Sequence, residues 1–503
     1  MKNILKKIKV GAGVMLLLGG ISSCSDFLDQ PVSGNFSELN FYKTEEEAQS
    51  ALVAAYDAYG NAYNAVWSSL YLLREIPSDD SNAGGSDGQD QPGHQNIDDF
   101  RIDAQNDQIQ GGWANLWSAM FRANKCINTT SVDFPKGNQI IAEAKVLRGF
   151  IYLDLVGLWG DVPLILEDIK PENFGNPVRV SKAEILQFVA DDLATAIDHL
   201  PNKKELGVGN KWRAHRGTAQ ALRGKALLWK GDFAGAATQL EEVINSNQYE
   251  LESNPMAPFS SKNEFGKESL FELNYSGEGT GFPWGSSADS NIIIQLMGPR
   301  SDFYVKVAGD TLDGGWGFNV PTAELYNAYG DADASRRDAF LWSEETLRAK
   351  GGNWNNSSAH DYEGFIRRKY GTFSTHTTGT FATDNYGSNF VLLRYADVLL
   401  MAAEANAKSA DEPNARIFLN RVRTRPGTGL PELNSSGAAL INDIIHERRV
   451  ELAFEGHRFM DLVRWGLAAE ELGNLGFISG KHELFPIPQI EVTASRMQQN
   501  PNY

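Results

Sequence analysis

The same spacing of small and branched apolar residues occurs twice in this chain, in two segments that lie 179 residues apart. In each segment, two stretches with helical periodicity are joined by a short turn, and Ala stands where two helices must approach closely. Units of about 34 residues that pair two helices are typical of tetratricopeptide repeats, which stack because one unit cannot bury its apolar face alone. Taken by itself, the recurrence also allows two unrelated helical hairpins. The matching positions are Ala226, Ala236, Leu240 and Val243 in the first segment and Ala405, Ala415, Leu419 and Val422 in the second.

Helical periodicity extends over most of the first half of the chain. Thr44 and Glu47 form a capping-box pattern that predicts a helix continuing to about Tyr59, and Ser181 with Glu184 repeats this pattern. Because apolar residues recur at three- and four-residue spacing, we predict a scaffold made mostly of α-helices. The other predicted helices are Trp113–Ile127, Gln139–Leu158, Ser181–Leu200, Gly217–Lys230 and Asp232–Asn245.

The middle of the chain has a different character. Residues 250–387 are rich in Gly, Ser, Asn and Thr, and only Ala323–Tyr329 and Glu344–Lys350 have short helical patterns. Long irregular connections, of which Ser78–Gln95 is a second example, are often functional in compact proteins. We therefore expect a mostly α fold in which tetratricopeptide-like helical repeats pack against an irregular, loop-rich ligand-binding region. The predicted boundaries are one domain over 24–503, with repeats at about 40–249 and 388–426, the loop-rich region at about 250–387 and a C-terminal region at about 438–503.

The N-terminus has the layout of a secretory signal peptide. Lysine residues within the first nine positions precede an apolar run over Val10–Ile21, which is too short and too rich in Gly for a convincing membrane-spanning helix. Ser22 and Ser23 then lead to Cys24, as in a lipobox. We predict a signal peptide over residues 1–23 and a lipid on Cys24, which would attach the protein to a membrane without a spanning segment. A plain signal peptide that is cut nearby remains the alternative.

Composition and motifs argue against several function classes. The net charge of -18 disfavours nucleic acid as a partner, because phosphate binding needs a basic face. His446 and Glu447 begin like the helix of a zinc protease, but Val450 stands where the second His ligand would be. The eight His are spread without the clustering that a metal site needs. We predict no catalytic residues, although a glycosidase stays open because its two carboxylates can lie anywhere in the chain.

A row of alternating charges lies near the C-terminus. Glu447, Glu451 and Glu455 recur at four-residue spacing, and Arg448 and Arg449 stand between them. On one helix this pattern places carboxylates beside guanidinium groups. Paired carboxylates can serve acid–base chemistry, but Glu residues beside several Arg stay ionised, which is the wrong state for a general acid. We therefore favour an Arg–Glu lattice that holds the C-terminal region onto the helical body.

Six longer motifs occur in order along the chain. They are Leu147–Leu155 (LRGFIYLDL), Trp159–Leu164 (WGDVPL), Leu393–Ala405 (LRYADVLLMAAEA), Glu447–Gly466 (ERRVELAFEGHRFMDLVRWG), Leu484–Gln489 (LFPIPQ) and Gln499–Tyr503 (QNPNY). In sequence and in order these motifs resemble those of the SusD/RagB family of outer-membrane nutrient-binding lipoproteins. Together with Cys24, the resemblance covers the chain from the lipobox to its last residue.

The resemblance implies how such a chain is used. It implies a protein that captures glycans at the outer-membrane surface and closes like a lid over a SusC-like, TonB-dependent transporter. It implies no catalysis and no cofactor apart from the covalent lipid on Cys24. Members of the RagB type suggest a different cargo, a peptide or another nutrient, and the sequence leaves this alternative open.

Aromatic side chains in loops are the residues that we expect to bind a glycan. Sugar rings present C–H faces that lie against aromatic planes, while amides, carboxylates and Arg orient the hydroxyl groups. A Trp between Gly or Asn residues in a loop has little local core to fill, although it can also anchor its loop. The candidates are Trp316, Trp354 and Trp284, followed by Tyr304, Trp67 and Tyr63.

The resemblance also suggests polar partners for the ligand. It implies a ligand face built from the loop after the first helix and from the central insertion. That position makes Arg74, Asp79, Asp80 and Asn82 candidates for hydrogen bonds to a sugar. The acidic stretch from 79 to 90 also allows a calcium ion, but its spacing is not that of an EF-hand loop, so we predict no metal site.

Overall fold

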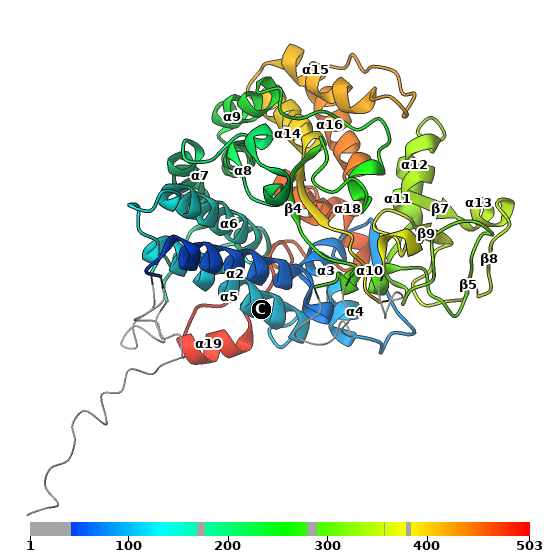
Figure 1. The fold of residues 1–503 in the computed structure, drawn as a ribbon. Helices are drawn as coiled ribbons and strands as arrows, with labels where there is room; N and C mark the ends of the chain where they lie inside the picture. Colours follow the sequence, from blue (N-terminus) through cyan, green and yellow to red (C-terminus); the bar gives the residue numbers. More distant parts are fainter. Residues whose placement is uncertain (1–41, 168–176, 279–288, 357, 379–383) are drawn as a thin grey trace, which may run out of the picture.

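The computed structural model describes residues 42–167, 177–278, 289–356, 358–378 and 384–503. Four pairs of helices form a continuous row, in which each pair packs on the next (Figure 1). α5 contacts α6, α7 contacts α8, and α9 contacts α14. The pairs are α2 (Glu45–Tyr63) with α5 (Asp107–Thr129), α6 (Gly137–Leu158) with α7 (Lys182–Ile197), α8 (Arg216–Lys230) with α9 (Phe233–Asn245), and α14 (Tyr395–Lys408) with α15 (Glu412–Arg423).

The row confirms the tetratricopeptide-like fold that the recurring pattern predicts. The two copies of the pattern are the neighbouring pairs α8–α9 and α14–α15, and all eight matching positions have no exposed surface. Since α9 packs directly on α14, the loop-rich region at 250–387 is an insertion between two repeats that touch in space. A residue such as Ala415 is small because another helix lies against it.

Helix ends follow the local signals in the sequence. Thr44 and Ser181 each form the predicted capping box, and the Asp232 carboxylate caps α9 by accepting a hydrogen bond from the Gly235 amide. α5 begins six residues earlier than its apolar pattern predicts. Asn106 explains the earlier start, because its side-chain oxygen accepts hydrogen bonds from the amides of the second and third helical residues.

The loop-rich region contains short helices and small antiparallel sheets instead of a single large sheet. The described strands form five two-stranded pairs. They are β1 (Ser81–Gly84) with β6 (Phe318–Pro321), β2 (Val162–Pro163) with β3 (Arg179–Val180), β4 (Ser269–Leu273) with β10 (Phe390–Arg394), β5 (Tyr304–Val305) with β8 (Asn353–Trp354), and β7 (Leu341–Ser343) with β9 (Phe365–Arg367). The short helices here are α10 (Ile292–Met297), α11 (Ala323–Ala328), α12 (Ala334–Phe340) and α13 (Glu344–Ala349), of which α11 and α13 were predicted.

The remaining elements connect this region to the row of helices. The 3₁₀ turns η2 (Val66–Ser68) and η6 (Ala257–Phe259) lie in the connections before α3 and β4. The other helices are α3 (Leu70–Glu75), α4 (Pro92–Asp98), α16 (Gly437–Glu451), α17 (Arg458–Trp465), α18 (Ala468–Glu471) and α19 (Gln489–Ser495). Within the described residues, no helix is both long enough and apolar enough to cross a bilayer.

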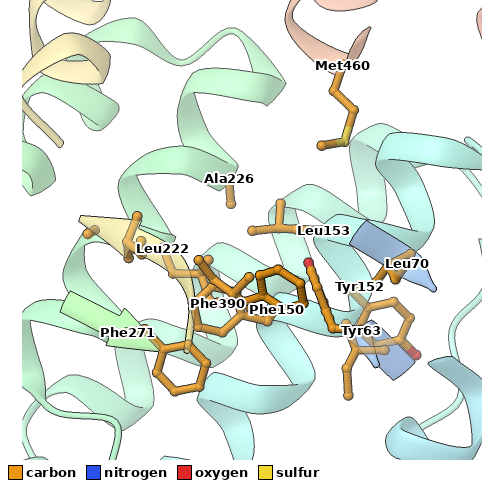
Figure 2. Packing of buried hydrophobic residues seen from close by; sticks show 14 of the residues in the cluster. Tyr63, Leu70, Phe150, Tyr152, Leu153, Leu222, Ala226, Phe271, Phe390 and Met460 are labelled. Atoms are coloured by element: carbon orange, nitrogen blue, oxygen red, sulfur yellow. The ribbon is translucent and has the colours of Figure 1, made fainter. Parts of the chain in front are cut away.

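One large hydrophobic core joins the helical row to the strands β4 and β10. Figure 2 shows Phe150 of α6 beside Phe271 of β4, and their ring centroids lie 4.6 Å apart in a stacked arrangement. Phe390 of β10 stacks on Tyr71 of α3 at the same distance. Because aromatic pairs of this kind bury large areas, these contacts fix the loop-rich region on the repeats.

The alternating charges form the predicted lattice, although α16 ends at Glu451 and Glu455 lies in the turn after it. Arg336 of α12 lies between Glu447 and Glu451, at 2.5 Å and 3.0 Å from their carboxylates. Arg394 of β10 likewise lies between Glu451 and Glu455, at 2.7 Å and 2.6 Å. All five side chains are buried, so each ion pair lies in a medium where an unpaired charge would be costly.

The lattice keeps its central carboxylate ionised. Burial alone would raise the pKa of Glu451, but the guanidinium groups of Arg425, Arg394 and Arg336 together hold it well below its usual value. A carboxylate in this state cannot act as a general acid. The structural interpretation of the motif is therefore confirmed, and the lattice links α16 to the insertion and to the strand that leads into α14.

Candidate ligand-binding site

Trp67 and Trp316 come from distant parts of the chain and meet at a partly exposed surface, which we call the aromatic platform. Their ring centroids lie 6.1 Å apart with an angle of 31° between the planes. Trp67 rests on the buried rings of Phe318, at 5.3 Å, and of His94, at 6.3 Å. Both Trp side chains pack against the main core and remain partly exposed. The structure therefore brings two of the predicted aromatic candidates together.

Trp67 lies in the turn that follows α2. Asn64 ties this turn to the start of α10, since its amide donates to the Ser290 carbonyl at 2.6 Å and its oxygen accepts from the Ile292 amide at 3.0 Å. The Trp67 carbonyl lies 2.7 Å from Nε2 of His94. Burial lowers the pKa of His94 to about 4, so its ring is neutral at physiological pH. These contacts hold the backbone of Trp67 in one place.

Trp316 is positioned by the glycines around it. The backbone amide of Trp316 donates to the Gln295 carbonyl at 3.0 Å, which lays its loop against α10. A Cβ atom at Gly315 would lie 2.5 Å from that same carbonyl oxygen, and Gly317 has a positive φ of 75°. Glycine at 315 permits the close approach without a clash, and glycine at 317 adopts this backbone conformation without strain. The Gly residues that flank Trp316 therefore allow the loop to pack closely on α10, while the indole remains partly exposed.

Arg300 supplies polar groups beside the platform. Its Nη1 donates to the Trp316 carbonyl at 3.1 Å, and its Nε lies 3.1 Å from the carboxylate of Asp302, whose side chain is 63% exposed. A cleft lined by Arg300, His360 and Trp354 has a volume of only about 20 Å³, which is room for one water molecule. This cleft is therefore too small for a sugar, and a ligand would contact the partly exposed faces of Trp67 and Trp316 instead.

Two other aromatic candidates are part of a small hydrophobic core. Trp354 and Tyr304 face each other across the β5–β8 pair and are 6% and 8% exposed. Trp354 stacks on Tyr362 with ring centroids 4.0 Å apart, and its Nε1 donates to the Asn356 carbonyl at 2.6 Å. The expectation that these two residues are exposed loop aromatics is wrong, because both side chains belong to a buried cluster that also contains Trp342 and Phe373.

Three of the polar candidates are buried in ion pairs. Asp79 accepts from Arg458 at 2.6 Å, and Asp80 accepts from Arg449 at 2.8 Å. Arg74 pairs with a buried aspartate, Asp154, at 3.2 Å and also donates to Tyr63, which is itself 1% exposed. Charged groups that are removed from water need partners within the protein. The expectation that these side chains face a ligand is therefore wrong.

The remaining candidates are Asn82, the acidic stretch that could hold a cation, and two residues outside the described part of the chain. Asn82 is partly exposed, but its amide donates to the Asp361 carbonyl at 3.1 Å and to Glu363 at 2.8 Å. One group of carboxylates, Asp79, Glu324 and Glu471, is close enough to hold a cation, but the guanidinium groups of Arg449 and Arg458 already lie among them. Cys24 and Trp284 lie outside the described residues.

The structure has a second hollow surface that the sequence did not predict, which we call the Arg368 groove. It has a volume of about 600 Å³, and its lining includes Trp342, Lys350, Arg368, Phe373 and His376. These residues come from β7, the end of α13 and the segment after β9. No local pattern in the sequence marks them, because the groove exists only where these segments meet η6. Arg300 was missed for the same reason.

Comparisons with known proteins show which proteins the chain is related to. The family described as the SusD family matches residues 334–476, and the one described as starch-binding associating with outer membrane matches residues 26–228. A protein from Formosa agariphila named SusD-like protein P2 is 28% identical over 532 residues, which cover 99% of this chain and all of that protein.

Solved structures show the same relationship. A laminarin binding SusD-like protein is 32% identical, covers 92% of this chain and all of its own, and superposes with a TM-score of 0.82. The surface glycan-binding protein A from Bacteroides thetaiotaomicron, in complex with laminarihexaose, is 26% identical. It also covers 92% of this chain and all of its own, with a TM-score of 0.78. These relatives are described as binding proteins. With this fold, these motifs and these relatives, the chain belongs to the SusD family.

Proposed function

We propose that this protein binds glycan chains on the aromatic platform and catalyses no reaction on them. The observation that carries the proposal is the meeting of Trp67 and Trp316, two partly exposed indoles that come from segments about half the chain apart. Indole faces suit the C–H faces of sugar rings, and the 31° angle between them makes a shallow bend that can follow a curved saccharide. Arg300 and Asp302 at the edge supply groups for hydroxyls.

The open shape of the platform favours a chain over a single sugar. A pocket of about 20 Å³ beside it is too small for a monosaccharide, whereas two adjacent rings can each contact one unit of an oligosaccharide. Laminarin is the first ligand to test, since a laminarin binding protein and a laminarihexaose complex are among the solved relatives. Starch is the second, because one matching family is described as starch-binding.

The proposal includes a place for the protein in the cell. We propose that Cys24 carries a lipid, that this lipid anchors the protein at the outer-membrane surface, and that a bound glycan passes to a SusC-like, TonB-dependent transporter. The family description, associating with outer membrane, supports the location. The Lys-rich start, the apolar run and the lipobox in the sequence support the anchor.

Titration calorimetry and affinity electrophoresis test the proposal. The purified protein is offered laminarin, laminarihexaose, starch and a mixture of peptides, and each mixture is analysed for new reducing ends. We expect one of the glycans to bind without new reducing ends. Reducing ends would show a glycosidase, and binding of peptides alone would show a cargo of the RagB type. Either of these results would overturn the proposal.

A further inference from the structure

The Arg368 groove has the size of a ligand site and differs in chemistry from the aromatic platform. Its volume of about 600 Å³ lies within the range of cavities that take small molecules. Its walls carry both charged and aromatic side chains, and none of the platform residues lines it. The function proposed above does not use it.

Arg368 is held rigidly in this groove. The centre of its guanidinium group lies 3.7 Å from the centroid of the Trp342 ring and 5.4 Å from that of Phe373. Its Nη1 donates to the carboxylate of Asp310 at 2.8 Å. The stack fixes the plane of the guanidinium, and the ion pair fixes its rotation within that plane. Arg368 therefore loses little freedom when it binds a ligand.

One edge of the same guanidinium is left for a ligand. Among the described residues, neither Nε nor Nη2 of Arg368 donates a hydrogen bond. These two groups form the edge that pairs with a carboxylate or a sulfate through two parallel hydrogen bonds. Because Arg368 lies directly on Trp342, that ring face is covered and cannot stack on a sugar.

The groove also carries an excess of positive charge. Lys350 is exposed, its ammonium lies 5.1 Å from the Trp342 ring, and it forms no ion pair within the described part of the chain. Asp338, which lines the groove, is paired with Arg337, and Asp310 beside the groove is paired with Arg368. In a protein with a net charge of -18, an unmatched cation of this kind favours an anionic ligand.

Neutral groups complete the lining. Nδ1 of His376 lies 2.9 Å from the hydroxyl of Ser388, and no described residue hydrogen-bonds to Nε2. Burial and the nearby charge of Lys262 lower the pKa of His376 to about 4, so the ring is neutral at physiological pH. Asn254 and Thr375 add an amide and a hydroxyl. A neutral imidazole, an amide and a hydroxyl suit the hydroxyl groups of a sugar.

We propose that the Arg368 groove is a second binding site, which takes a saccharide unit that carries an oxyanion, either a carboxylate or a sulfate. The Nε–Nη2 edge of Arg368 pairs with the oxyanion, Lys350 adds a second charge, and the neutral groups hold hydroxyls. The choice of a saccharide rests on the proposed glycan-binding function, whereas the choice of an oxyanion rests on the groove alone.

Matched pairs of polymers test this site. The full protein is titrated with dextran sulfate against dextran, and with polygalacturonate against its methyl ester. We expect binding of a charged polymer and none of its neutral partner. Arg368→Gln should weaken this binding about tenfold or more, because a hydrogen bond to a charged group is lost. Lys350→Gln should weaken it about two- to fivefold.

Arg348→Gln is the matched control. It removes the same charge two positions before Lys350, in the last turn of α13. Arg348 is exposed like Lys350, but it pairs with Glu344 and does not line the groove. We expect this variant to bind the charged polymers like the wild type. If Arg368→Gln proves unstable in thermal unfolding, Lys350→Gln carries the test, because that side chain is exposed and forms no ion pair with any residue that the structure describes.

The outcomes separate this site from the platform. Binding of only the sulfate or only the carboxylate polymer supports the proposal and names the oxyanion. Equal binding of charged and neutral polymers, no binding, or equal losses in Lys350→Gln and Arg348→Gln would each overturn it. Laminarin binding serves as the reference for the platform, and we expect it to be unchanged by all three variants and weakened only by Trp316→Ala.

Discussion

Replacing Trp316 by alanine is the most direct test of the aromatic platform. The change removes one of two adjacent indoles whose ring centroids lie 6.1 Å apart, and it leaves Trp67 on its buried support. Losing the contact between one indole and one sugar unit should weaken binding by about 1–3 kcal/mol. That free energy corresponds to a rise in Kd of about 5- to 150-fold.

The same change should cost little stability. Removing a fully buried Trp side chain costs about 3–5 kcal/mol. Because Trp316 is only partly buried at the edge of the core, we expect its loss to cost about 1–2 kcal/mol. The variant should therefore fold, and its affinity should be measurable.

Titration calorimetry with laminarihexaose and urea unfolding measure these two quantities. Trp354→Ala is the control, since Trp354 also follows Gly and Asn in the sequence but is 6% exposed in strand β8 and stacked on Tyr362. We expect Trp354→Ala to lose about 3–5 kcal/mol of stability and its folded fraction to keep the wild-type affinity. Wild-type affinity in Trp316→Ala, together with lost affinity in a folded Trp354→Ala, would refute the reasoning.

Three further predictions concern the charges and the anchor. Burial would raise the pKa of Glu404 and of Glu451, but neighbouring cations hold both well below the usual value of 4.5. These two ionised carboxylates therefore stabilise the fold at pH values above 4.5, and their contribution is lost as the pH falls below that value. We expect the Tm to fall between about pH 5 and pH 3, and a constant Tm would contradict this. Glu451→Gln should lower the free energy of unfolding in urea by about 3–5 kcal/mol. Glu412→Gln, at a partly exposed ion pair, should lower it by about 0–1 kcal/mol. Equal losses in the two variants would argue against the lattice. Cys24→Ala should move the protein from the membrane fraction to the soluble fraction, and continued tight membrane association would disprove the anchor.

The helical scaffold could be predicted from the sequence because its determinants are local. The capping box at Thr44 and the cap at Asp232 depend on residues within one turn of the helix end. The recurring Ala and Leu positions report the packing of one repeat on the next, as at Ala226 and Ala405. Each of these signals is a spacing between residues that are close along the chain, and such a spacing can be read directly from the sequence.

The polar candidates failed because their partners lie far away in the sequence. Asp79 is paired with Arg458, which is 379 positions further along the chain, and Asp80 is paired with Arg449, 369 positions away. An acidic cluster in a loop has the same local pattern whether it faces water or a buried guanidinium. Only the fold decides between the two, because burial of these carboxylates depends on α16 and α17 reaching them.

Trp316 and Trp354 show the same limit on a smaller scale. Trp316 stands between two Gly residues and Trp354 follows Gly352 by two positions, yet only Trp316 stays partly exposed. A Cβ atom at Gly315 would lie 2.5 Å from a carbonyl oxygen of α10, so glycine lets this loop pack closely on α10, and the indole of Trp316 stays partly exposed. Around Trp354 the strand pairing with Tyr304 and the stack on Tyr362 close over the ring. A glycine near a Trp in the sequence therefore does not distinguish a partly exposed indole from a buried one, because Gly352 also lies close to another element, the strand β5. What buries Trp354 is its pairing with Tyr304, which lies far away in the sequence.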